Sequence, residues 1–159
     1  MADKTNASRI LERLGIPFEL IEYKVDPDNL DAMHVAQELG QDISTVFKTL
    51  VLNGDKTGHF VCVIQGDKEV DLKKAARVSG NKKVAMIPMK ELLPLTGYIR
   101  GGCTAIGMKK NFPVFIDLNA LKHQMIHISA GKRGLQIKLN PEDYIKATRA
   151  SVYDLITDI

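Results

Sequence analysis

One lysine interrupts a strongly apolar segment of the chain. Lys48 lies within residues 46–52, where the alternation of a strand would bury or half-bury its side chain. An ammonium group buried without a partner is costly, so this side chain must reach solvent, pair with a carboxylate or serve a binding site. In a site, its three donors and positive charge would suit an ester carbonyl, a ribose hydroxyl or a phosphate.

A glycine-rich segment at residues 97–107 could supply backbone donors. Gly101 and Gly102 are adjacent, and such a pair lets backbone N–H groups turn toward a ligand with no Cβ in the way. Two donors of this kind can form an oxyanion hole, which lowers the barrier to acyl transfer. The spacing fits neither the Walker phosphate loop nor a dinucleotide fingerprint.

A second polar turn follows the strand that ends at Ser129. Two glycines and two cations occupy residues 131–134. Ser129 is not framed by the GxSxG pattern of a nucleophile elbow, so we expect it to hydrogen-bond a ligand hydroxyl or amine.

The other residue types that often catalyse reactions do not form a recognisable site. Cys103 could be a nucleophile, but neither a histidine nor a carboxylate is close to it in the sequence. His123 and His127 are four residues apart, but a strand is predicted at His127, which breaks the helical face that a metal pair requires. We therefore predict no metal and no cofactor. Hydrolysis would then need a positioned water or a nucleophile supplied by the substrate.

Strands and helices alternate irregularly along the chain. Apolar alternation and turn signals predict strands at residues 18–23, 46–52, 59–66, 82–87, 112–117, 125–129 and 135–139. Capping residues and glycine stops predict helices at residues 6–15, 32–40, 71–80 and 89–95 and after residue 140, and a short helix is expected between residues 117 and 125. This order favours an α/β fold with a mixed, strongly curved sheet, a partial barrel with flanking helices. The 159 residues, without repeat or linker, predict one domain over residues 1–159.

Charge is distributed unevenly along the chain. Residues 1–45 hold four basic and nine acidic residues, whereas residues 97–133 hold six basic residues and one acidic residue. A solvated face would explain this, but the basic residues cluster around glycine-rich loops, which favours a phosphate-bearing partner. The residues expected to contact its backbone are Arg100, Lys109, Lys110, Lys132 and Arg133. We expect no membrane association and a cytoplasmic location, because the sequence shows neither a membrane span nor a secretory signal.

Three separated motifs resemble the YbaK type of trans-editing domain, which is related to the insertion domain of bacterial prolyl-tRNA synthetases. They are FKTLVL around Lys48, LTGYIRGG and IGMKK at residues 95–102 and 106–110, and ISAGKRGLQI at residues 128–137. The resemblance spans nearly the whole chain. It implies an editing enzyme that deacylates mischarged Cys-tRNA(Pro), binds the acceptor end of tRNA(Pro) and has prolyl-tRNA synthetase as a partner.

The resemblance also implies roles for individual residues. Lys48 and the backbone of Gly101 and Gly102 would be catalytic: Lys48 would hold the terminal adenosine and the aminoacyl ester, and a glycine N–H would stabilise the oxyanion. The substrate's own thiol would attack the ester, because a thiol with a pKa of about 8.5 is partly ionised at neutral pH. The residues implied to contact the substrate are Tyr23, Thr49, Thr104, Ser129 and Gln136.

The chain departs from the family pattern at three positions. Thr104 and Ala105 stand where the family commonly has Ser-Pro, and Gln136 stands where an aspartate is frequent. The glutamine removes a charge that could attract the substrate's α-ammonium. Two alternatives therefore stay open beside Cys-tRNA(Pro) deacylation. One is hydrolysis of Ala-tRNA(Pro) by water, and the other is a non-catalytic module that binds tRNA or prolyl-tRNA synthetase.

Overall fold

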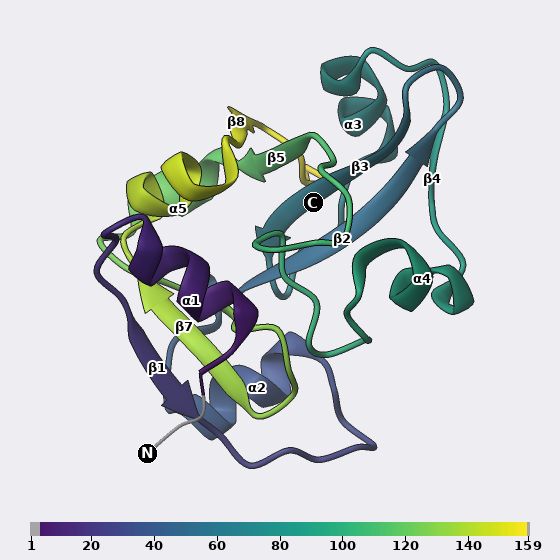
Figure 1. Ribbon diagram of the computed structural model, residues 1–159. Coiled ribbons are helices and arrows are strands. Elements are labelled where there is room, and N and C mark those ends of the chain that lie inside the picture. Colours follow the sequence, from purple (N-terminus) through teal and green to yellow (C-terminus); the bar gives the residue numbers. More distant parts are fainter. Residues whose placement is uncertain (1–3, 159) are drawn as a thin grey trace.

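The computed structural model describes residues 4–158, so residues 1–3 and 159 of the predicted domain lie outside the described part (Figure 1). Its helices are α1 (Asn6–Arg13), α2 (Ala32–Leu39), α3 (Leu72–Ser79), α4 (Leu92–Thr96) and α5 (Pro141–Thr148), with 3-10 helices η1 (Ile43–Thr45), η2 (Met89–Glu91) and η3 (Leu118–Lys122). Its strands are β1 (Glu19–Glu22), β2 (Phe47–Gly54), β3 (Gly58–Gln65), β4 (Val84–Met86), β5 (Val114–Asp117), β6 (Ile126–Ser129), β7 (Leu135–Leu139) and β8 (Ser151–Tyr153). The predicted mixed α/β fold is confirmed.

Within residues 4–158 the strands form two sheets. An antiparallel sheet has the order β1-β7-β6, and a mixed sheet has the order β4-β2-β3-β5-β8, in which β5 and β8 are parallel to their neighbours. A parallel bridge between Val46 and His127 joins the start of β2 to β6 and thereby connects the two sheets. Where the sequence predicted one strongly curved sheet, the described residues form two sheets that this bridge joins.

Most helices begin and end where the sequence marks them. Thr5 caps α1, Asp31 caps α2, and Gly40 closes α2 in the left-handed conformation that favours glycine. The helix expected at residues 89–95 is divided into η2 and α4. β8 was not predicted, because three residues directly after a helix are too few to show the alternation of a strand.

Two apolar clusters lie on opposite faces of β2 and β3. Val51 packs into a large cluster with residues of β6, β7, α1 and α5, whereas Leu52 packs into a smaller cluster with Ala75 of α3. Successive side chains of a strand alternate between faces. Thr49 therefore lies on the face of Val51, and Lys48 lies on the face of Leu52.

Among the described residues, no helix is both long and apolar enough to cross a membrane.

Asn81 ties the β2–β3 turn to the loop after α3. Its Oδ1 accepts from the backbone N–H groups of Lys56 and Thr57, both at 2.8 Å. Its Nδ2 donates to the hydroxyls of Thr57 and Ser79, also at 2.8 Å. The side chain is 9% exposed. These bonds hold the far end of β2, the strand that carries Lys48.

Replacing Asn81 with alanine should therefore destabilise the fold. We expect the free energy of unfolding to fall by about 2 kcal/mol, because four hydrogen bonds are lost and water replaces part of them. Thermal denaturation should show a Tm lower by about 4–8 °C. Asn53→Ala, at an exposed position on the same hairpin, is the control and should leave the Tm nearly unchanged. An unchanged Tm for Asn81→Ala would contradict this role.

Candidate functional site

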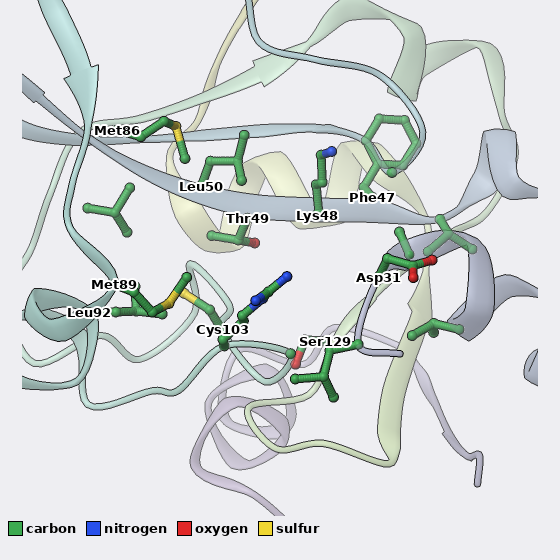
Figure 2. Close-up of a pocket in the computed structure, with 18 of the residues that line it drawn as sticks. Asp31, Phe47, Lys48, Thr49, Leu50, Met86, Met89, Leu92, Cys103 and Ser129 are labelled. Carbon is green, nitrogen blue, oxygen red and sulfur yellow. The ribbon is translucent and has the colours of Figure 1, made fainter. Parts of the chain in front are cut away.

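A cavity of about 320 Å³ lies beside the first half of β2. Its lining comes from β2, the start of α2, the segment from β4 to α4, the glycine-rich loop and the facing strands β6 and β7 (Figure 2). Six residues that the sequence analysis selected line it together: Lys48, Thr49, Arg100, Gly101, Ser129 and Gln136.

The cavity exists because one edge of β2 is only partly paired. β3 pairs along the whole of β2, but on the opposite edge β4 pairs only with residues 52–54. The Val51 carbonyl accepts from Ile87 N at 3.2 Å, so the Val51 backbone faces the β4 edge. Because backbone groups alternate in direction along a strand, those of Thr49 face the same edge, beyond the end of β4. This open edge can bond a ligand.

Lys48 is an unpaired cation at this edge. Within residues 4–158, its ammonium has neither a hydrogen-bond partner nor a carboxylate within ion-pair distance. Burial lowers the pKa of Lys48, and the charges of Glu69 and Asp67 oppose this shift. Figure 2 shows Lys48 and Thr49 on opposite sides of β2, and both line the cavity, which therefore reaches around the strand edge.

Ser129 and Gln136 form a buried polar end of the cavity. They lie opposite each other in the register of β6 and β7, and they are 8% and 5% exposed. The Ser129 hydroxyl accepts from Gly131 N at 3.1 Å, which leaves its proton for a ligand. Oε1 of Gln136 has no hydrogen-bond partner among the described residues. A buried acceptor without a partner costs about 1–3 kcal/mol, which a ligand N–H would recover.

The two glycine-rich loops pack directly against each other. A Cβ added at Gly102 would lie 3.0 Å from the Lys132 Cα and 3.1 Å from the Arg133 N. Arg133 Nε donates to the carbonyl of Arg100 at 2.8 Å. Arg133 is therefore held next to Arg100, which lines the cavity, whereas Lys132 and Arg133 do not line it themselves.

One of the two predicted oxyanion donors is already engaged. The N–H of Gly102 donates to the Ile99 carbonyl at 2.9 Å, so it is not free for a ligand. The N–H of Gly101 has no partner within residues 4–158, and Gly101 lines the cavity. The structure thus leaves Gly101 as the available donor of the pair.

Other predicted residues do not line the cavity. Tyr23 follows β1, and its N–H donates to the Gly134 carbonyl at 2.9 Å. Thr104 is fully buried, and its hydroxyl has no hydrogen-bond partner among the described residues. Lys109 and Lys110 are exposed on the loop before β5.

The cysteines have protonated thiols at neutral pH. Burial raises the pKa of Cys103, which lines the cavity, to about 12, and it does the same for Cys62. A protonated thiol is a poor nucleophile, so the burial of Cys103 argues against a role as the attacking group. Among residues 4–158, no group of three or more His, Cys, Asp or Glu side chains could hold a metal ion.

Two features of the lining were not found from the sequence. Asp31 contributes a carboxylate, one oxygen of which accepts from His34 N at 2.9 Å as the cap of α2. The other feature is an apolar wall drawn from three segments of the chain: Leu50, Met86, Met89 and Leu92. No local pattern links these positions, because they meet only in the folded chain.

Comparison with known proteins defines the class. Residues 26–147 match the model of the aminoacyl-tRNA editing domain, and this chain belongs to that family. It is 47% identical, over 97% of its length and 94% of the relative's, to an Enterococcus faecalis protein provisionally named Cys-tRNA(Pro)/Cys-tRNA(Cys) deacylase EbsC. It is also 26% identical to the uncharacterised Bacillus subtilis protein YwhH, over 74% of each chain.

Solved structures share the fold. One, provisionally described as a trans-editing enzyme for prolyl tRNA synthetase, aligns with a TM-score of 0.84 at 25% identity and covers 98% of this chain and 99% of that one. The hypothetical protein APE2540 aligns with a TM-score of 0.88 at 22% identity, over 96% of this chain and 100% of that one. The resemblance to an editing family seen in the sequence is therefore confirmed.

The contact between the two glycine-rich loops gives a second prediction. Gly102→Ala should push the backbone of Lys132 and Arg133 away and destabilise the protein by about 1–3 kcal/mol. Hydrogen exchange should become faster at residues 130–134. Ile99→Ala, at an exposed position of the same segment, is the control and should change neither quantity. Wild-type exchange rates in Gly102→Ala would show that the loops do not depend on this contact.

Proposed function

We propose that this protein deacylates mischarged aminoacyl-tRNA in trans, in the cytoplasm, and that Cys-tRNA(Pro) is its substrate. The observation that carries the proposal is that three hydrogen-bond donors line one cavity: the ammonium of Lys48, the amide of Gly101 and the hydroxyl of Ser129. Membership of the editing family and the name of the Enterococcus relative support the class of substrate.

The substrate would supply the nucleophile. Of the described residues that line the cavity, none is a histidine, and Asp31 alone carries a carboxylate, which caps α2. In the proposed reaction, the cysteine thiol attacks its own ester carbonyl, so that a C–S bond forms and the C–O bond to the ribose breaks. The thiol proton ends on the ribose hydroxyl, and water then opens the cyclic thioester to free cysteine.

The protein would position this reaction and stabilise its charge. The N–H of Gly101 would donate to the oxyanion that develops on the ester carbonyl. Lys48 would hold the ester and the ribose of the terminal adenosine, because its three donors have no other described partner. Oε1 of Gln136 would accept from the substrate's α-amine, which satisfies an acceptor that otherwise lacks a partner.

The cations beside the cavity would bind the phosphates of the acceptor end. Arg100 lines the cavity, Arg133 donates to the Arg100 carbonyl, and the backbone of Lys132 packs on Gly102. Lys109 and Lys110 would extend this surface. A chain of this size would contact mainly the end of the tRNA, so prolyl-tRNA synthetase is a suitable partner for recognising the rest.

A deacylation panel tests this proposal. Wild-type protein should deacylate Cys-tRNA(Pro), should lose activity when the substrate thiol is S-methylated, and should act slowly on Ala-tRNA(Pro). Lys48→Ala should lower kcat/KM by about 100-fold or more, because a positioned charge at the ester is lost. Lys56→Ala, which removes an exposed lysine from the β2–β3 turn, is the matched control.

Each contrary outcome points to a named alternative. Equal rates on the S-methylated and free substrates would contradict attack by the thiol. Equal rates on the alanyl and cysteinyl substrates would favour hydrolysis by water. Binding of tRNA without turnover would favour a non-catalytic module.

The pH dependence tests the state of Lys48. The value of kcat/KM should rise with pH as the substrate thiol ionises, and it should fall once Lys48 loses its proton. Since burial lowers the pKa of Lys48, this fall should begin below the ordinary lysine value of about 10.4. In Lys48→Arg, the activity that remains should lack the falling limb, because a guanidinium stays charged. A falling limb that persists in Lys48→Arg would assign it to another group.

A further inference from the structure

The cavity has two chemically different ends. The right side of the view in Figure 2 holds the polar lining residues Lys48, Asp31 and Ser129. The left side holds the apolar ones: Leu50, Met86, Met89 and Leu92. The second group comes from β2, β4, η2 and α4. We call these four side chains the apolar end.

The apolar end is open to solvent. Met86 is 45% exposed and Met89 is 58% exposed, whereas Ser129 and Gln136 at the polar end are at most 8% exposed. Large flexible side chains held at the rim of a cavity leave apolar surface in water, which a flat apolar ligand would cover. The two methionines are therefore more open to solvent than Ser129 and Gln136, although Asp31 at the polar end is also exposed.

The proposed substrate has the same division. Its amino acid carries an α-amine that needs hydrogen-bond partners, and its terminal nucleotide carries an uncharged, flat base. The nucleotide stays attached to the rest of the tRNA, so its base must lie at the rim, whereas the amino acid can enter the buried end. The unpartnered Oε1 of Gln136 and the free hydroxyl proton of Ser129 suit the amine.

We propose that the apolar end binds the terminal adenine base of the aminoacyl-tRNA, with Met86 and Met89 packed against its ring. This inference rests on the proposed function. Thioether sulfur is polarisable and makes favourable contacts with aromatic rings. Apolar packing is enough to bind this base, because every tRNA ends in adenosine and the site does not have to distinguish adenine from other bases. The adenine at this end and the amine at the other would place the ester between them, beside Lys48 and Gly101.

The test combines a protein change with a substrate change. The variants are the double mutant Met86→Ala/Met89→Ala and the conservative Met86→Leu/Met89→Leu. Met33→Ala is the matched control, since Met33 lies on α2 with 44% exposure and does not line the cavity. Each protein is assayed on Cys-tRNA(Pro) with a normal 3′ end and with a terminal ribose that lacks its base.

For the wild type, loss of the base should raise KM by about 10-fold, which is near the lower end of the effect of losing a base stacked on an aromatic side chain. The change in kcat should be smaller. The double alanine variant should show the raised KM on the normal substrate and no further rise on the baseless one. The leucine variant and Met33→Ala should still distinguish the two substrates. A double alanine variant that distinguishes them as the wild type does would overturn the inference.

A second measurement separates this inference from the proposed function. With methionine methyl groups labelled with ¹³C, adenosine 5′-monophosphate should shift the Met86 and Met89 resonances by the ring current of adenine and leave Met33 unchanged. A wild type that fails to deacylate any charged tRNA would refute the proposed function, and these shifts would still report on the adenine site. Unmoved Met86 and Met89 resonances at saturating nucleotide would overturn the site itself.

Discussion

The site depends on one edge of β2, which is bridged to β6 at Val46 and then has no described strand partner until residue 52. The bridge between Val46 and His127 holds the two sheets together, and no further bridge between β2 and β6 follows it in the described part of the chain. β4 closes the same edge of β2 only from residue 52 onward. The gap between them exposes backbone groups and the Lys48 side chain to one cavity. A fully paired β2 would have no room for a ligand at this edge.

The charge of Lys48 then determines what the cavity can accept. A half-buried cation without a described partner favours an electron-rich ligand, and burial lowers its pKa without a carboxylate close enough to pair with it. The free Gly101 amide adds a donor, and the Ser129 hydroxyl proton adds another. Donors are therefore plentiful, whereas a general base is missing from the described lining. Such a site suits a substrate that carries its own nucleophile.

The sequence was informative where a residue conflicts with its local pattern. Lys48 in an apolar strand, the glycine pair at 101–102 and a serine at a strand end each stand out locally, and Lys48, Gly101 and Ser129 line the cavity. The features of the site that the sequence could not predict depend on tertiary contacts. The hydrogen bond from the Gly102 amide to the Ile99 carbonyl forms only in the folded loop, so the sequence could not predict it. The apolar end joins three segments of the chain that share no periodicity. The fold class followed from element order, but the division into two sheets depends on one long-range bridge.

The central claim is that the substrate, not the protein, supplies the attacking group. It is tested most directly by single-turnover deacylation of tRNA(Pro) charged with cysteine or with serine, which differ only in a sulfur or an oxygen. The account predicts that the cysteinyl ester is cleaved at least about 100-fold faster, because a serine hydroxyl is a much weaker nucleophile without a base. Equal rates on the two substrates would contradict it and would assign the attack to water.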